Sequence, residues 1–405
     1  MLTKEQNERL TSVEGEAPMA RLLREGYWLP FSRIEGLAAG APPVRVRLLG
    51  GDYVAFRGED GRIGFIDERC PHRGVSMALA RLEGCALRCI FHGWLVDGSG
   101  KVVEVPTEGD RSATVAERVP FNHYPVAEHC GLVWVFLGEG DAPALPELPW
   151  AGLEGDSVWI TRSVVPANWL QGLEAALDSA HVNFLHSAWP RNESEMDEQS
   201  RRFIAVPRFA VDDTEYGMRT AAIRESDDGV ALVRISEFLT PFIAMTPAPL
   251  QYGERSGTFF IAVPVDDGNH LLFWGIFSQT GEIGSFFMRD QCKDQDNYAN
   301  PSGSRDDNWG QDREAMARGH FSGFPDQLLL EDVVAQVSMG PVVDRSLDFL
   351  THTDIAVQRC RQLILKLIER FEAGEAVDGS LPGVSTGLLP RGALIPGDAD
   401  WRTIR

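Results

Sequence analysis

The sequence predicts an α+β protein of two domains, and three observations support this class. The chain has 405 residues, 43% of them hydrophobic, which is enough for two domains with sizeable cores. Residues 44–139 contain short apolar runs between turns, as in a small β-domain. The remainder mixes helical periodicity with longer strand-like runs, which is typical of an α+β domain.

The predicted β-domain is built of short strands. Four runs have the pattern of strands: 44–49, 53–56, 63–66 and 131–137. The second and third flank the turn Glu59-Asp60-Gly61, which is a hairpin signal. A Pro-rich connector follows at 142–149, so we expect domains at 1–149 and 150–405.

The second predicted domain carries three helical patterns and several strands. The helices are expected at 168–186, 328–336 and 353–373, the last of which stops at Gly374. Strand candidates lie within 203–245, and a strand pair is expected at 257–263 and 270–277. Residues 289–319 are polar and poor in large apolar side chains, which predicts a long loop.

The β-domain contains two Cys–His pairs. Cys70 and His72 are followed by Cys89 and His92, with sixteen residues between His72 and Cys89. This spacing is typical of a Rieske [2Fe–2S] cluster, in which two thiolates hold one iron and two imidazoles hold the other. A Cys₂His₂ zinc site is the alternative, but zinc fingers usually pair Cys with Cys and His with His.

The residues beside each Cys–His pair also suit a cluster. Gly74 and Gly93 follow the second ligand of each pair closely, and Trp94 comes directly after Gly93. Glycines let backbone N–H groups approach sulfur, and such hydrogen bonds tune the cluster potential. We expect Trp94 to support the cluster ligands from behind.

Four polar side chains interrupt the apolar pattern of residues 168–186: Glu174, Asp178, His181 and His186. The first three fall within about 60° of one helical face. Burying such groups costs several kcal/mol unless they bind one another or a metal. His186 lies about 140° from His181 on an ideal helix, so both can bind one ion only if the helix breaks, and we expect a break near Asn183.

Two histidines and one carboxylate form the facial triad of non-haem Fe(II) oxygenases. The carboxylate must come from further along the chain, where the helical segment 328–336 holds Glu331 and Asp332. These acids lie about 100° apart on a helix, and the pattern alone does not choose between them.

Composition excludes some partners. The net charge of −21 argues against nucleic acid and against anionic membrane surfaces. No apolar run approaches the roughly 20 residues that span a membrane, and the N-terminus has no secretory h-region. Six cysteines, two of them expected as cluster ligands and four scattered, fit a reducing compartment, so we expect a cytoplasmic protein.

On these motifs the chain resembles the Rieske non-haem iron ring-hydroxylating oxygenases, oxygenase (α) component, and most of all their phthalate dioxygenase-like branch. The resemblance runs nearly end to end and is carried by residues 1–5, 70–74, 89–94, 168–186 and 331–346. It implies a Rieske β-domain followed by a helix-grip (START-like) catalytic domain with an antiparallel sheet. It also implies a homotrimer.

The resemblance further implies roles for single residues. Asp332, rather than Glu331, would be the third iron ligand beside His181 and His186. Asp178 would be catalytic, bridging His181 to His92 of a neighbouring subunit. Glu174 is expected to support the iron ligands from behind.

The implied activity is that of the oxygenase component of a multicomponent system. It would use O₂ and electrons from NAD(P)H to hydroxylate or dihydroxylate an aromatic substrate. The electrons would come through a separate reductase of flavin and ferredoxin type, because no Gly-x-Gly-x-x-Gly fingerprint follows a strand in this chain. An O-demethylase or monooxygenase acting on an aryl ether is an alternative, and a non-catalytic Rieske electron carrier is a second.

An aromatic acid is the substrate that this branch suggests, and its carboxylate would need a cation in the pocket. Three arginines on strand-like segments are candidates: Arg208, Arg224 and Arg234. By strand alternation, Arg234 would share a face with Ser236 and Phe238.

Overall fold

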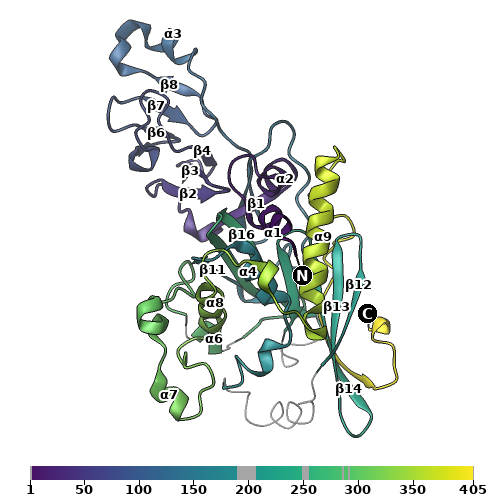
Figure 1. Ribbon diagram of the computed structural model, residues 1–405. Helices are drawn as coiled ribbons and strands as arrows, with labels where there is room; N and C mark the ends of the chain where they lie inside the picture. The colour runs from purple at the N-terminus through teal and green to yellow at the C-terminus, as the bar shows by residue number, and fades with distance from the viewer. Residues whose placement is uncertain (1, 189–206, 249–254, 285–286, 291, 405) are drawn as a thin grey trace. The chain divides into compact units, whose positions relative to one another are not determined.

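The computed structural model describes residues 2–188, 207–248, 255–284, 287–290 and 292–404. The chain forms two compact units, Val13–Leu145 and Met1–Ser12 with Pro146–Arg405 (Figure 1). The observed boundary after Leu145 falls inside the Pro-rich connector, close to the predicted one at 149. The first twelve residues differ from the prediction, because they pack with the second unit.

The unit of residues 13–145 consists of three small antiparallel sheets. Their strands are β1 (Trp28–Arg33), β10 (Leu132–Phe136) and β9 (Val126–His129); β2 (Val44–Leu48), β3 (Gly51–Arg57) and β4 (Ile63–Asp67); and β5 (Arg81–Glu83), β6 (Ala86–Arg88), β7 (Leu95–Asp97) and β8 (Val102–Glu104). The predicted hairpin is β3–β4, with Tyr53 opposite Asp67. Helices α2 (Pro18–Gly26) and α3 (Ser112–Ala116) complete the unit.

An apolar core lies under the two loops that carry the Cys–His pairs. Phe56, Ile66, Met77 and Leu87 are buried in it together with Cys70 and Cys89. The short strands therefore support both loops from one packed cluster.

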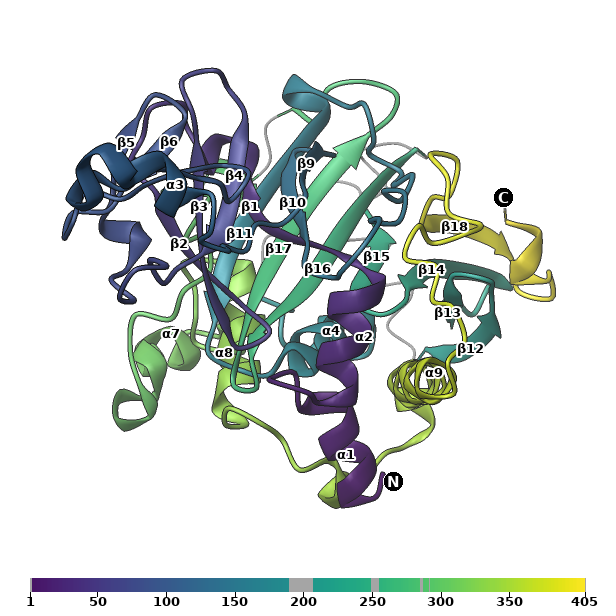
Figure 2. The same cartoon turned by 90° about the horizontal axis from the view of Figure 1, so that it is seen from above.

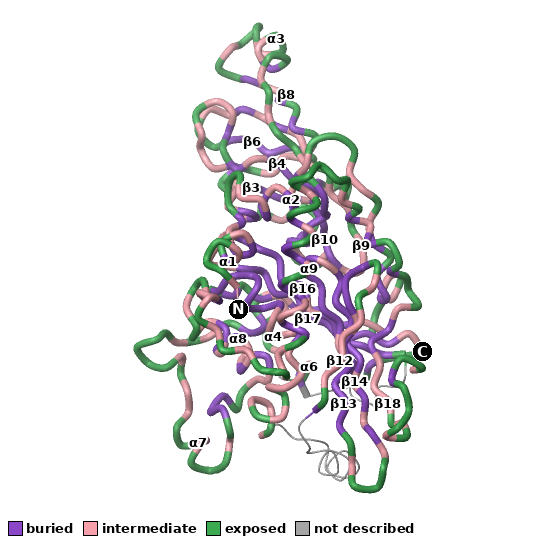
Figure 3. The backbone as a smooth tube through the Cα atoms, turned by 45° about the vertical axis from the view of Figure 1, so that its right-hand side comes forward, coloured by how far each residue is buried: buried purple, intermediate pink, exposed green. Residues whose placement is uncertain are grey.

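The other unit is built on one large antiparallel sheet. Its strand order is β11-β17-β16-β15-β14-β13-β12, and β18 also pairs with β14. The strands span Val158–Val165 (β11), Arg208–Asp213 (β12), Gly217–Glu225 (β13), Val230–Leu239 (β14), Ile243–Pro247 (β15), Ser256–Asp266 (β16), Asn269–Ser278 (β17) and Arg391–Pro396 (β18). Most residues of the central strands are buried (Figure 3).

Helices cover one face of this sheet. Leu329 and Val333 of α8 (Leu328–Ser338) pack on Leu272, Trp274 and Ile276 of β17. Helix α4 (Trp169–Leu177) packs closely on the same face. At Gly172 a Cβ would lie only 2.4 Å from Nε2 of the buried His270 of β17. Helix α9 (Ile355–Glu372) contacts α4, β12 and β13, and α1 (Lys4–Thr11) contacts α9 (Figure 2).

The predicted helix over 168–186 ends earlier than expected. Helix α4 stops at Leu177, and Asp178 has an extended backbone with φ −81° and ψ 105°. The Asp178 carboxylate accepts the Ala180 N–H at 2.7 Å, a local turn that competes with the helix. The break therefore falls before His181, where a 3₁₀ turn begins (His181–Asn183), and not near Asn183.

Other predicted elements are confirmed, with one difference. Helix α9 covers the predicted C-terminal helix, and Gly374 follows it with a φ of +81°, as a helix stop requires. The segment 289–319 is not without structure, because α7 (Arg313–Ala317) and a 3₁₀ turn (Arg305–Gly310) lie in it. Among the described residues, no helix is both long and apolar enough to cross a membrane.

Candidate functional site

The two Cys–His loops have the same backbone hydrogen bonds. The Cys70 N–H donates to Val75 O at 2.9 Å, and the Cys89 N–H donates to Trp94 O at 2.9 Å. In each loop a glycine N–H returns to the cysteine carbonyl, from Gly74 at 2.8 Å and from Gly93 at 3.0 Å. Both glycines have a φ of +74°, which other residues rarely adopt.

The side chains of these loops converge. Cys70 and Cys89 are buried in the core of the unit, whereas His72 and His92 are half-buried, with their Nδ1 atoms 3.1 Å apart. Trp94 stacks on His72, with ring centroids 4.8 Å apart and planes 5° from parallel. Two thiols inside and two imidazoles toward the surface are the donor set that a Rieske cluster requires.

Two further observations fit a cluster here. The Trp94 Nε1–H is buried without a hydrogen-bond partner among the described residues, so it is available to a group between the loops. Burial raises the pKa of the Cys70 thiol to about 11, although the backbone N–H groups of His72 and Arg73 donate to its sulfur. Those N–H groups would instead stabilise a metal-bound thiolate.

A second donor set lies in the larger unit, between the segment after α4 and helix α8. The Nε2 atoms of His181 and His186 lie 3.3 Å and 3.2 Å from the same carboxylate oxygen, Oδ1 of Asp332. One donor atom from each residue falls within 4.8 Å of the other two, so the group could hold a metal ion. The end of α4 at Leu177 makes this convergence attainable, because the histidines are released from helical spacing.

Each imidazole has a carboxylate behind it. Asp178 Oδ2 lies 3.6 Å from His181 Nδ1, and Glu331 Oε2 lies 2.6 Å from His186 Nδ1. Glu331 thus faces His186 from the side opposite Asp332. In the sequence, Glu331 was considered only as an alternative metal ligand to Asp332. The two residues are adjacent on the helix, so their side chains point about 100° apart, and Glu331 is directed away from the two Nε2 atoms.

The charges of this group are strongly coupled. Burial lowers the pKa values of both imidazoles, but the neighbouring carboxylates outweigh it and raise them to about 10 for His181 and about 9 for His186. Burial raises the pKa of Asp332, yet the two histidines hold it well below its usual range. These shifts favour protonated imidazoles, and a metal cation bound there would replace the protons.

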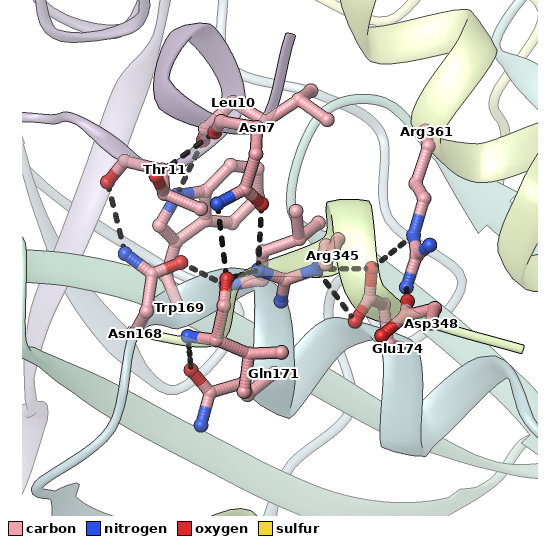
Figure 4. Close-up of polar contacts among 12 residues, drawn as sticks. Asn7, Leu10, Thr11, Asn168, Trp169, Gln171, Glu174, Arg345, Asp348 and Arg361 are labelled. Carbon is pink, nitrogen blue, oxygen red and sulfur yellow. Dashed lines mark hydrogen bonds and ion pairs between the residues drawn. The ribbon is translucent and has the colours of Figure 1, made fainter. Parts of the chain in front are cut away.

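Glu174 does not lie with these ligands, contrary to the prediction. Its carboxylate binds Arg345 Nε at 2.9 and 3.0 Å and Arg361 Nε at 2.6 Å (Figure 4). Arg361 also pairs with Asp348, and Arg345 Nη1 lies 3.4 Å from Asn7 Oδ1. The network ties α4 to α1, α9 and the segment before α9, so Glu174 anchors the helix from which the metal-binding segment continues.

The three candidate arginines separate into two groups. Arg224 and Arg234 lie on the same face of β13 and β14, because Ala222 is opposite Arg234 in the register. The register continues across the sheet from Phe238 on this face to Phe260 of β16 and Trp274 of β17. Trp274 packs against α8, so the two arginines lie on the face that the helices cover. As predicted, Arg234 shares its face with Ser236 and Phe238.

Arg208 is not placed with them. It lies opposite Ile223 on the other face of the sheet, its side chain is 62% exposed, and it pairs with Glu225 at 3.8 Å. Alternation cannot tell which face of a strand the helices will cover, so this residue was chosen on residue type alone.

Arg224 is a buried cation, and Arg234 is half-buried. Arg224 Nη2 donates to Ser179 O at 3.3 Å, next to Asp178, and Arg234 Nη2 donates to Pro247 O at 3.0 Å. Among the described residues neither pairs with a carboxylate, and the Arg224 Nε–H has no partner. Burial lowers the pKa of Arg224, and burial together with the Arg224 charge lowers that of Arg234 to about 10.

A pair of Cys–His loops in a β-unit and a two-histidine, one-carboxylate site on a helix-covered sheet define a Rieske-type iron oxygenase. The comparisons agree. Residues 27–124 match the Rieske [2Fe-2S] domain, and residues 135–405 match the family described as LigXa C-terminal domain like.

Relatives match over nearly the whole chain. The oxygenase subunit of phthalate 4,5-dioxygenase from Pseudomonas putida is 36% identical, over 99% of this chain and 94% of that protein. The oxygenase subunit of 3-chlorobenzoate-3,4-dioxygenase from Comamonas testosteroni is 32% identical, over 99% and 97%. The solved terminal oxygenase of carbazole 1,9a-dioxygenase from Novosphingobium sp. KA1 shares the fold, with a TM-score of 0.58 and 23% identity over 90% of this chain and 97% of that one.

The chain belongs to the family of oxygenase (α) subunits of Rieske non-haem iron oxygenases, as the sequence predicted. It is an oxidoreductase of a multicomponent system, with a [2Fe–2S] cluster, a mononuclear iron, O₂ as cosubstrate and electrons from a reductase. The zinc alternative fails, because the match to the Rieske [2Fe-2S] domain includes both Cys–His pairs. The electron-carrier alternative fails, because the match extends over the oxygenase subunits at full length.

Proposed function

We propose that this chain adds both atoms of O₂ to the ring of an aromatic acid. The observation that carries the proposal is a pair of arginines, the buried Arg224 and the half-buried Arg234, on the sheet face that the helices cover. Two guanidinium groups that are withdrawn from water, one fully and one in part, are costly when they have no acidic partner among the described residues. One or two carboxylates on a bound substrate would neutralise them and form strong charge-assisted hydrogen bonds.

The metal ligands in this proposal are those of the two donor sets. Cys70, His72, Cys89 and His92 hold the cluster, and His181, His186 and Asp332 hold the mononuclear iron. Three protein ligands leave open positions at such an iron, where O₂ is activated. The hydrogen bond from Arg224 to Ser179 supports a substrate carboxylate close to the metal-binding segment.

The electron route in this proposal crosses between copies of the chain. His72 and His92 are the half-buried ligands of the cluster loops, and the side chain of Asp178 is 29% exposed behind His181. Asp178 can therefore hold His181 with one oxygen and accept a hydrogen bond from His92 of the neighbouring subunit with the other.

A closed ring of three copies is the assembly that we propose, because a head-to-tail contact has to close. Exposed apolar side chains support such contacts in each unit. Ile90 and Phe91 are 57% and 54% exposed beside the cluster loops, and Leu347 and Phe349 are 79% and 91% exposed in the other unit. The reductase that supplies this oxygenase would be a separate chain of flavin and ferredoxin type. We expect both proteins in the cytoplasm.

The test is a screen of substrates followed by isotope labelling. The purified protein, with NADH and a surrogate reductase, is offered benzoates, phthalates and uncharged aryl ethers while O₂ uptake is recorded. We expect an aromatic acid to stimulate uptake most, and its product to carry both atoms of one ¹⁸O₂. One labelled atom, or a demethylated ether, would establish the monooxygenase or O-demethylase alternative instead.

Matched arginine variants locate the substrate carboxylate. We expect Arg224→Gln and Arg234→Gln to raise KM for the acid by about 10- to 100-fold, as for the loss of a hydrogen bond to a charged group. Arg208→Gln, on the other face of the sheet, should leave KM unchanged. Equal KM values for all three variants would contradict the assignment.

A further inference from the structure

Glu331 and the turn of residues 320–323 form a buried hydrogen-bonded chain that ends on His186. The Glu331 side chain is fully buried, and its Oε2 lies 2.6 Å from His186 Nδ1. Its other oxygen, Oε1, accepts a hydrogen bond from the Ser322 hydroxyl. The carboxylate is thus held between a metal-binding histidine and a residue nine positions earlier in the chain.

The 320–323 turn is itself held firmly. Ser322 Oγ accepts the Phe324 N–H at 3.2 Å, and the Gln311 side chain donates to Ser322 O at 2.6 Å. The Asp312 N–H donates to Gly323 O at 2.8 Å, and a Cβ on Gly323 would lie 2.8 Å from Gln311 Cγ. Only glycine allows the turn to lie this close to the start of α7, and Gly323 also has a φ of +80°.

The same turn contacts the metal-binding segment at a second point. The ring of Phe321 lies 6.3 Å, centroid to centroid, from the ring of Phe184, which stands between His181 and His186 in the chain. Phe184 and Phe321 are both largely exposed, so this contact is a surface contact beside the buried one. The 320–323 turn therefore contacts the segment of His181 and His186 twice, once through the buried Glu331 and once at the surface.

We propose that Glu331 is a positioning residue for the mononuclear metal, and that the Ser322 hydroxyl orients the Glu331 carboxylate. Glu331 contacts His186 Nδ1 and thereby holds the ring so that Nε2 is directed at Asp332. Carboxylates behind metal-binding histidines also raise the basicity of the ligand, and losing one typically costs about 10- to 100-fold in metal affinity. The 320–323 turn thereby controls metal affinity. This inference rests on the proposed metal site at His181, His186 and Asp332.

The experiment compares metal binding by Glu331→Gln, Ser322→Ala and wild-type protein. The mononuclear site is depleted, the cluster is left intact, and Co(II) is titrated by its visible absorption, with Fe(II) retention against a chelator as a second measure. We expect the dissociation constant to rise about 10- to 100-fold in Glu331→Gln, and by a smaller factor in Ser322→Ala. Ser338→Ala, an exposed hydroxyl on the same helix, is the control and should bind like wild type.

The outcomes separate the two claims. If wild-type protein binds no metal beyond its cluster, the proposed metal site is wrong. If it binds, and both variants bind within about twofold of wild type, only the role of Glu331 is wrong. A purely structural role predicts a lower Tm with unchanged affinity, which also overturns the inference. Should Glu331→Gln fail to fold, Ser322→Ala alone decides.

Discussion

The two proposed metal-binding regions of this chain are built in different ways. Each cluster loop is a single turn, whose cysteine, histidine and glycine lie within five residues and whose backbone N–H groups of cysteine and glycine bond within the turn. The mononuclear site instead joins a segment after α4 to helix α8, with His186 and Glu331 145 residues apart. One site is encoded locally, and the other exists only when two distant helices are packed on the same sheet face.

This difference predicts which substitutions should impair each site. The cluster loops depend on their own residues and on the small core beneath them. The mononuclear site depends on side chains that never touch the metal, such as Arg345 and Arg361, which hold α4 through Glu174. Variants far from the metal should therefore impair the second site and leave the first intact.

The largest effect on turnover is expected for Asp178→Asn, which alters the carboxylate behind His181. The amide keeps the shape of the carboxylate but loses the charge that faces His181 and would accept from a cluster histidine of the next subunit. We expect both metals to remain and turnover to fall by about 100-fold, the upper end of what such a loss typically costs. The measurement is the rate at which the pre-reduced cluster is reoxidised with substrate and O₂.

Asp213→Asn, which alters an exposed carboxylate paired with Arg359, is the control for this variant. Reoxidation of Asp178→Asn at the wild-type rate would sink the role of Asp178, and an active monomer by light scattering would sink the route between subunits.

Arg345→Met tests the distant support of α4. The Arg345 side chain is fully buried on Glu174, and removing one partner of a buried ion pair typically costs about 3–5 kcal/mol. We expect a loss near the lower end, because Arg361 still binds Glu174. The free energy of unfolding from urea titration measures it, and the Rieske EPR signal should be unchanged.

Arg370→Met is the matched control, because Arg370 pairs with Glu375 on the surface at 2.6 Å, and exposed pairs contribute about 0–1 kcal/mol. Equal losses in the two variants would mean that the buried network does not support this unit.

A smaller effect is expected from pH. Burial alone would raise the pKa of Glu174, but the charges of Arg345 and Arg361 hold it below its usual value of 4.5. A depressed folded-state pKa means that the unfolded chain binds the proton more readily, so this stabilisation is present above pH 4.5 and is lost as pH falls through the folded value.

The difference in unfolding free energy between wild type and Glu174→Gln should therefore narrow as pH is lowered from about 6 to below 4.5. Glu375→Gln, at the exposed pair, should show little difference at either pH. A constant difference for Glu174→Gln would show that its charge is not what the arginines stabilise.

The same contrast explains what could be predicted from the sequence. The β3–β4 hairpin and α9 follow from local spacing and periodicity and were predicted directly, and the proposed cluster ligands rest on local spacing in the same way. The end of α4 was misplaced because helical periodicity continues through Asp178, whereas its side chain forms a local turn with Ala180. The partner of Glu174 could not be foreseen, because Arg345 lies 171 residues further along the chain.

Two further features needed the packed structure. Arg208 and Arg224 are both strand arginines in the sequence, and only the helices on one face of the sheet distinguish them. Glu331 and Asp332 are adjacent acids, and the choice between them came from family resemblance. The fold adds that Asp332 faces both Nε2 atoms while Glu331 stands behind His186.

The most direct test of the account is iron analysis and O₂ uptake of Asp332→Ala beside Ser338→Ala. Both variants change α8, but only Asp332 is placed to hold the metal. We predict that Asp332→Ala keeps the cluster EPR signal with about two irons per chain, loses the third iron and shows no substrate-dependent O₂ uptake. Retention of the third iron with wild-type uptake would contradict the assignment of the mononuclear site.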